Sequence, residues 1–377
     1  RTWYDDAFIF LMLRGFGASN QCLEHDTWRF ETMSVRRAFL FVSVALILII
    51  MTPSLKTAGN EVKGGMEILL CNPLIEQLGM GSTWEAAKAV GVKGIEIHVE
   101  SDLSCSKLFV GKETPYRLDS RENALRIRSD ALQNELLTPV LVAPILLEPK
   151  KVKSEGAPSW ALQLIEVAPV VGAELIYFPI VTDNFTQVTI PDEEFIEASV
   201  FLLNDLVAAG NRHGVEIALE NLSVYWNRAE ILDKVLFEFA PEELGVCLDP
   251  INFYWYGHPR GDVYKLFDQF VPRAKHFHAK NVKHKVAKRE VEREPGWKYS
   301  EDSVAVEDGD LDFERMIGLL VDADYDGYIG IEDDSLELHE PEERLAVLRK
   351  DVEYVRRIVK GYKGNFSDRE ETEKSKR

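Results

Sequence analysis

Cysteine is scarce in this chain, with only four residues among 377. Cys22, Cys71, Cys105 and Cys247 are too few and too scattered for a disulfide framework. None of them forms a CxxC pair with the spacing of a zinc site. We therefore expect the four cysteines to be small hydrophobic residues buried in the core.

Basic residues are also in deficit. Lys and Arg total 44 against 63 Asp and Glu, which gives a formal net charge of -19. A field of this sign repels a phosphate backbone, so we expect no nucleic-acid partner. The acidity says little about small substrates, because a bound cation and a few local Lys or Arg residues can outweigh it inside a cleft.

One apolar run, over residues 38–51, stands out near the start of the chain, and it is short for a membrane span. It follows Arg36 and Arg37 and precedes small and polar residues, which is typical of a Sec or twin-arginine signal peptide. We therefore expect residues 1–65 to be a separate leader, in which 33–59 is either signal-like or an untranslated upstream segment. Translation from Met33 would give an exported protein, and translation from Met66 a cytoplasmic one. Neither start predicts a stable membrane span in the mature domain.

Short apolar runs alternate with amphipathic stretches from Met66 onward, which is the pattern of parallel strands joined by helices. Eight strands are predicted, over residues 66–71, 94–99, 138–146, 173–179, 215–221, 244–249, 274–278 and 328–332. Helices are predicted over residues 84–90, 121–135, 160–171, 192–212, 228–239, 311–323 and 341–360. Eight strand and helix units predict an α/β fold of the (β/α)8 TIM barrel type, as a single domain over residues 66–362.

The main alternative is a doubly wound open sheet, but its usual GxGxxG signature after the first strand is missing. The longest irregular stretch, residues 281–309, follows the seventh strand and suggests a lid over the active face. Residues 363–377 are polar and alternate in charge, so we expect a disordered tail.

Four predicted strands end in a possible metal ligand: Glu220, Asp249, His278 and Glu332. Strand side chains alternate, so the apolar neighbours of these residues would face the helices while the four would point into the barrel. Barrel active sites lie at the carboxyl ends of the strands, where the four would converge. Three carboxylates and one imidazole favour one divalent metal ion, Mn²⁺, Mg²⁺ or Co²⁺, with Zn²⁺ as an alternative.

A calcium loop competes with this interpretation, because residues 322–333 nearly fit DxDxDG with an acidic twelfth position. The flanks argue against it, since the next helical pattern begins only near Pro341. The same residues are typical of a helix end, a turn at Asp326 and Gly327, and a buried strand.

The strings ALEN, LGVCLDPINFYWYG, HFHAKN and EDGDLDFERMIGLLVDADYDGYIGIE, which contain the four residues, resemble the sugar phosphate isomerase/epimerase family of the xylose isomerase-like superfamily. The resemblance runs from about Met66 to Lys360. It implies that the four positions bind one divalent metal and that Glu220 and Glu332 also shuttle protons. Asp249 and His278 would then be structural ligands.

The implied chemistry is also physically reasonable. A metal that chelates the carbonyl and hydroxyl oxygens of a ketose or keto-sugar acidifies the carbon-bound hydrogen and stabilises an enediolate. One carboxylate removes the proton and another returns it. Return to the same carbon is epimerisation and return to the neighbouring carbon is isomerisation, and the sequence does not choose between them.

Further residues are predicted to contact the substrate. Of Glu96 and His98 at the end of the second strand, we expect one to face the interior and favour Glu96. Lys280 follows the metal histidine, and Trp255 lies just beyond a ligand-bearing strand. Asn252 stands where relatives commonly have His, and an amide cannot carry a proton near neutral pH.

Other functions stay open. A DNA-repair endonuclease shares the fold but uses several zinc ions and many histidines, whereas this chain has eight histidines and the wrong charge. A metal-dependent sugar or inosose dehydratase and a non-catalytic sugar-binding barrel are the stronger alternatives. The sequence does not reveal the oligomeric state, and a homo-oligomer is one option.

Overall fold

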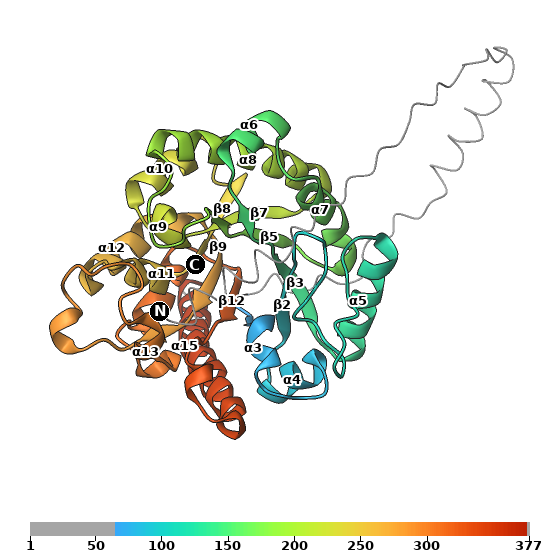
Figure 1. Ribbon diagram of the computed structural model, residues 1–377. Helices are drawn as coiled ribbons and strands as arrows, with labels where there is room; N and C mark the ends of the chain where they lie inside the picture. The colour runs from blue at the N-terminus through green and yellow to red at the C-terminus, as the bar shows by residue number, and fades with distance from the viewer. Residues whose placement is uncertain (1–64, 375–377) are drawn as a thin grey trace, which may run out of the picture. The chain divides into compact units, whose positions relative to one another are not determined.

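The computed structural model describes residues 65–374, which form a closed barrel of eight parallel strands surrounded by helices (Figure 1). The predicted leader therefore falls outside the described residues, apart from Gly65. Around the barrel the strands follow the order β1-β12-β9-β8-β7-β5-β3-β2. Their bounds are β1 Ile68–Cys71, β2 Gly94–His98, β3 Leu137–Val142, β5 Leu175–Phe178, β7 Glu216–Glu220, β8 Leu244–Leu248, β9 Ala274–Ala279 and β12 Tyr328–Ile331.

The predicted (β/α)8 fold is confirmed, with one strand at each of the eight predicted places. The strand predicted over residues 138–146 was too long, because it splits into β3 and a short outer strand, and a second short outer strand follows β5 beyond the predicted range 173–179. The chain leaves β3 before Pro144 and leaves β5 before Pro179, and proline cannot donate to a strand ladder. The outer strands β4 (Ile145–Leu146) and β6 (Ile180–Val181) pair with each other in a separate two-stranded sheet.

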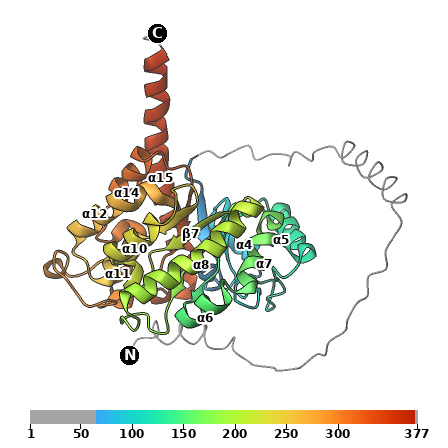
Figure 2. The same cartoon turned by 90° about the horizontal axis from the view of Figure 1, so that it is seen from above.

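Helices cover the outside of the barrel (Figures 1 and 2). Ser82 and Ser120 start α4 and α5 by accepting hydrogen bonds from backbone N–H groups of the first turn. The helices are α3 Asn72–Glu76, α4 Thr83–Val90, α5 Arg121–Gln133, α6 Pro149–Glu155, α7 Ser159–Val171, α8 Asp192–His213, α9 Ser223–Trp226, α10 Ala229–Phe237, α11 Pro250–Tyr256, α12 Arg260–Phe270, α13 Tyr299–Asp302, α14 Phe313–Asp322 and α15 Pro341–Lys374. No helix within residues 65–374 is long and apolar enough to cross a bilayer.

Two apolar layers result from the alternation of strand side chains. Ile217 and Leu219 of β7 lie in the large layer between the barrel and its helices. Ala218 of the same strand lies in a small inner layer with Leu69, Val140, Val142, Leu175, Tyr177 and Cys247. Glu220 therefore shares the inward face with Ala218, as the period of two predicts.

The irregular stretch over residues 281–309 is tied to the barrel at both ends. Strand β10 (Asn281–Val282) pairs antiparallel with β11 (Ser303–Val304). The Asn281 amide group donates to the carbonyl oxygens of Val306 and Leu311 at 2.8 and 2.9 Å. The stretch is thus an anchored loop, and its role as a lid stays a prediction.

The calcium-loop alternative is ruled out by the path of the chain. Residues 328–331 form a buried barrel strand rather than the second half of a loop, and the next α-helix begins only at Pro341. The preceding turn is closed by the Tyr325 hydroxyl, which donates to the Tyr328 carbonyl oxygen at 2.6 Å.

The C-terminal tail differs from its prediction. Helix α15 continues to Lys374 and so includes most of the segment expected to be disordered (Figure 2). The segment after Gly364 contains no proline and is rich in Arg, Glu and Lys, which have good helix propensity. Charge alternation by itself therefore did not distinguish a helix from disorder.

The outer apolar layer predicts where the barrel is sensitive to truncation. Phe277 of β9 is fully buried against Phe267 and Phe313, with ring centroids 5.7 and 5.9 Å apart. We expect Phe277→Ala to lower the free energy of unfolding by about 3–5 kcal/mol in urea denaturation. Phe237→Ala removes the same side chain at a position that is 87% exposed, and should change it by less than about 0.5 kcal/mol. Equal effects of the two substitutions would contradict this packing.

Candidate metal centre

Glu220, Asp249, His278 and Glu332 meet at the carboxyl end of the barrel. Each offers one ligand atom, and the four atoms all lie within 4.8 Å of one another. The residues come from β7, β8, β9 and β12 or from the position directly after the strand, and these strands are neighbours in the barrel. Three of the residues are buried, whereas the Glu332 side chain is 29% exposed. The cluster therefore opens toward solvent beside Glu332.

The imidazole of His278 is at the centre of this cluster. Its Nδ1 lies 3.4 Å from Glu220 Oε1, 3.7 Å from Asp249 Oδ2 and 3.3 Å from Glu332 Oε2. Nδ1 is buried and has no hydrogen-bond partner among residues 65–374. Ligand atoms about 2.1 Å from one ion lie roughly 3.0–3.4 Å apart in octahedral or tetrahedral geometry, so the distances to Glu220 and Glu332 fit a shared cation, whereas Asp249 Oδ2 lies slightly farther away. The donor set of three oxygens and one nitrogen also fits a divalent metal.

Asp249 is held in place by the start of the next helix. It caps α11, with Oδ1 accepting from the N–H groups of Ile251 and Asn252 at 2.8 and 3.2 Å. Its backbone is paired with the side chain of Asn221, which donates to the Asp249 carbonyl oxygen at 2.8 Å and accepts from its N–H at 2.7 Å. Sequence reasoning missed Asn221 as a site residue, although it follows Glu220 directly in the ALEN string. Together these bonds leave Oδ2 directed at the cluster.

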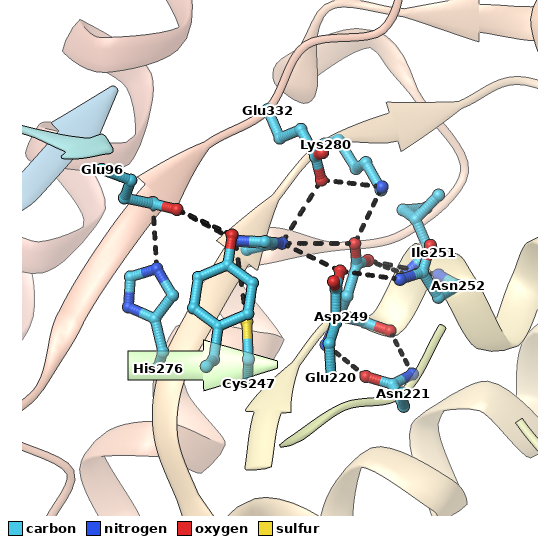
Figure 3. A network of polar contacts seen from close by, with 12 residues as sticks. Glu96, Glu220, Asn221, Cys247, Asp249, Ile251, Asn252, His276, Lys280 and Glu332 are labelled. Atoms are coloured by element: carbon cyan, nitrogen blue, oxygen red, sulfur yellow. Dashed lines mark hydrogen bonds and ion pairs between the residues drawn. The ribbon is translucent and has the colours of Figure 1, made fainter. Parts of the chain in front are cut away.

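Lys280 lies between the carboxylates, as Figure 3 shows. Its Nζ is 3.0 Å from Asp249 Oδ2 and 2.8 Å from Glu332 Oε2. Burial by itself would lower the pKa of Lys280, but the carboxylates of Asp249 and Glu332 outweigh burial and raise this pKa well above its usual value. The amine is therefore a fixed positive charge within the site, whether or not it also contacts a substrate.

The two glutamates predicted to shuttle protons have different surroundings. Burial raises the pKa of Glu220 above its ordinary value, and the His278 imidazole opposes this effect only in part. Burial acts on Glu332 as well, but Lys280 and His278 outweigh it and lower the pKa of Glu332 to about 2. Before any cation binds, Glu332 is therefore the more strongly anionic of the two.

Asn252 and Trp255, the two predicted substrate contacts on α11, differ in their distance from the cluster. The Asn252 amide donates to Glu220 Oε1 at 3.2 Å, so this residue touches a candidate ligand. Trp255 is 7% exposed and packs edge to face on Phe185, with ring centroids 4.9 Å apart. The contacts described for Trp255 are those of a packing residue, and its role toward a substrate stays a prediction.

Glu96 faces the interior of the barrel, as the sequence predicts. Its side chain is fully buried, and its carboxylate contacts His276, His278 and Tyr177 inside the barrel. The choice between Glu96 and His98 was unnecessary, since residues two apart on a strand point to the same face. The contacts described for Glu96 are those of a residue inside the barrel, and its role toward a substrate stays a prediction.

Two further site residues, Asp334 after β12 and Tyr299 in the anchored loop, were not found from the sequence. Asp334 Oδ2 lies 3.7 Å from Lys280 Nζ and accepts a hydrogen bond of 2.5 Å from the Tyr299 hydroxyl. Burial raises the pKa of Asp334 to about 6. Tyr299 starts α13 in the anchored loop, so this loop reaches the site through Asp334 and Lys280. The acidic residues after Glu332 were a signal for Asp334, whereas nothing in the sequence pairs Tyr299 with it.

The chain matches the family described as Xylose isomerase-like TIM barrel over residues 84–358. It belongs to this family. The family predicted from the strand-end motifs is thereby confirmed. Among curated proteins, no match in sequence was found.

Solved structures of several xylose isomerase-like barrels are similar to this fold. An L-ribulose 3-epimerase is 10% identical with a TM-score of 0.57, covering 80% of this chain and 97% of its own. The IOLI protein with a binding zinc atom is 17% identical with a TM-score of 0.56, covering 78% and 99%. A xylose isomerase-like protein from Mycobacterium smegmatis in complex with magnesium is 14% identical with a TM-score of 0.56, covering 78% and 96%. At these identities the likeness shows the fold.

The geometry predicts one divalent cation for each chain. Because a bound cation stabilises the folded state, we expect added Mn²⁺ to raise the unfolding free energy by about 2.7 kcal/mol at a hundred times its dissociation constant. Glu220→Gln and His278→Ala should each weaken Mn²⁺ binding at least tenfold in calorimetric titration. His213→Ala changes an exposed histidine at the end of α8 and should leave the affinity unchanged. Parent-like affinity in both site variants would show that the cation does not bind here.

Proposed function

We propose that this xylose isomerase-like barrel is a divalent-metal-dependent sugar isomerase or epimerase that moves a proton on a ketose or keto-sugar through an enediolate. The observation that carries the proposal is the placement of Glu220 and Glu332 on either side of His278 Nδ1, at 3.4 and 3.3 Å. The two carboxylates come from β7 and β12, which β8 and β9 separate in the barrel. A substrate bound to a cation at this point would thus have a carboxylate from β7 and another from β12 close to it.

When bound, a divalent cation would act as a Lewis acid that stabilises the negative charge developing on the substrate oxygens. Glu220 and Glu332 would remove and return the carbon-bound proton. Each of these carboxylates has a donor that restrains it: Asn252 Nδ2 donates to Glu220 Oε1 at 3.2 Å, and Lys280 Nζ donates to Glu332 Oε2 at 2.8 Å. Such restraint keeps the reacting oxygens in position, which is a large part of the rate gain in proton transfer.

The comparisons support two parts of this proposal, the sugar-processing type of barrel and the divalent metal. The fold is that of an L-ribulose 3-epimerase, and similar barrels have been solved with zinc and with magnesium. The partly open cluster beside Glu332 suits a small, polar substrate. A dehydratase would also begin with proton removal, so the products decide between the two reactions.

Proton transfer through an enediolate predicts exchange with solvent. Turnover of a productive ketose in D₂O should give product with deuterium at the reacting carbon, detected by NMR. Glu220→Gln and Glu332→Gln should each lower kcat by about 10² to 10⁴-fold. Glu216→Gln, at the opposite end of the Glu220 strand, is the matched control and should leave kcat unchanged. Product free of deuterium would indicate a hydride shift, and loss of water would indicate a dehydratase.

A second prediction concerns Asn252, whose amide restrains Glu220 at a position where relatives commonly carry His. Asn252→His should leave Mn²⁺ affinity within about twofold, since the four ligands are intact, while kcat or substrate preference changes. The measurement is a comparison of kcat/KM over a panel of ketoses and keto-sugars. A variant equal to the parent on every sugar it converts would place Asn252 outside the reacting site.

A further inference from the structure

Beneath the candidate metal centre, Glu96 occupies the barrel interior with every oxygen engaged. Its Oε1 lies 2.9 Å from His276 Nε2, and its Oε2 accepts a hydrogen bond of 3.1 Å from the Tyr177 hydroxyl. Oε2 also lies 3.4 Å from His278 Nε2. Figure 3 shows Glu96 and His276 on the opposite side of the network from Glu220 and Asn252. A fully buried carboxylate with these contacts is expected to have a specific structural task.

The two nitrogens of His278 face different groups. Nδ1 faces the oxygens of Glu220, Asp249 and Glu332 and makes no hydrogen bond, while Nε2 faces Glu96. A neutral imidazole carries one proton, and the nitrogen that binds a cation must be the one without it. A carboxylate beside Nε2 stabilises the tautomer with the proton on Nε2 and so frees the lone pair of Nδ1.

We propose that Glu96 is a positioning residue that holds the proton of His278 on Nε2 and thereby keeps Nδ1 available as a metal ligand. This inference deepens the proposed function, because it rests on the cation site formed with Glu220, Asp249 and Glu332. Glu96 touches neither the cation position nor the open end of the barrel, and it acts only through His278.

Gly330 of β12, the strand beside the one that carries His278, supports this assignment. Gly330 pairs in register with His278, and a Cβ atom added there would overlap the Glu96 carboxylate and lie 3.1 Å from His276 Nε2. The strand that carries Glu332 therefore lacks a side chain where Glu96 needs space. Glycine weakens a strand interior, so a close approach of this kind explains its presence.

The competing interpretation is a second metal site formed with the buried thiols of Cys71 and Cys247. Cys71, Glu96 and His278 form one group, and Cys247, His276 and His278 another, that could hold an ion, with ligand atoms within 4.8 Å of one another in each. Cys247 Sγ lies 3.6 Å from His278 Nε2. A second cation at that nitrogen would require Nε2 to be without its proton. The protonation of Nε2 thus separates a positioning carboxylate from a second metal site.

The decisive measurement uses the unaltered protein. In nitrogen-15 histidine NMR with Zn²⁺ bound, we expect His278 Nε2 to carry its proton and Nδ1 to show the shift of a metal-bound nitrogen. The His278 signals are assigned by their loss in His278→Gln. A proton on Nδ1, or a metal on Nε2 with a second equivalent of Zn²⁺ bound, would overturn the proposal.

Substitution gives an independent measurement. Glu96→Gln keeps the shape of the side chain but replaces one acceptor oxygen by an NH₂ donor, which cannot accept from the donors that face it. We expect Zn²⁺ affinity to fall about 10 to 100-fold, as for other residues that orient a metal histidine. Glu100→Gln, four residues later on the same segment and bonded to Ser106, is the matched control and should bind Zn²⁺ like the parent.

Gly330→Ala should lower the Zn²⁺ affinity of the parent protein. In the Glu96→Gln background it should lower the Zn²⁺ affinity little further, because both changes act through the Glu96 side chain. Parent-like Zn²⁺ affinity in Glu96→Gln would overturn the proposal. If Glu96→Gln does not fold, the NMR measurement on the parent decides. Absence of sugar turnover would contradict the proposed function but leave these binding and tautomer results unaffected, so the two failures are distinguishable.

Discussion

Mutual repulsion among three carboxylates around one imidazole is the constraint on which the active end of this barrel depends. Glu220, Asp249 and Glu332 are brought together by the closure of the sheet, with most of their surface removed from water. Unpaired charges in such a place are strongly unfavourable, so each must be compensated. Lys280 supplies one fixed positive charge, and a cation at the common point beside His278 Nδ1 would supply the rest.

Both backbone and side-chain donors stabilise the negative charge of these carboxylates. The start of α11 donates two N–H groups to Asp249, and an amide from the same helix restrains Glu220. Asp334, after β12, accepts a hydrogen bond from Tyr299 of the anchored loop, so that the loop and the site are linked through Lys280. A change in the loop would therefore reach Glu332 through charged contacts rather than through the apolar core.

The inner layer of the barrel has a different role, because it holds buried polar side chains in fixed orientations. Glu96 is hydrogen-bonded to His276 and Tyr177 inside the barrel, and the aromatic ring of Tyr177 stacks on His276 with centroids 5.5 Å apart. Apolar residues surround this layer, which makes its polar contacts stronger and the loss of any one of them more costly. The xylose isomerase-like barrel thus has a rigid polar base below a site that opens to solvent.

The sequence by itself determined the barrel and the convergence of the four candidate ligands, because both depend on short-range periodicity. Alternation along each strand decides which face Glu220 occupies, and parallel strands place their carboxyl ends at one edge. How deep each inward-facing side chain lies within the barrel was decided only by the tertiary structure. Strand tilt and stagger are settled when the sheet closes, and they placed Glu96 below the site rather than at its mouth. The pairing of Tyr299 with Asp334 likewise depends on the path of a long loop. The two residues are 35 positions apart in the chain, so no local sequence pattern encodes their contact.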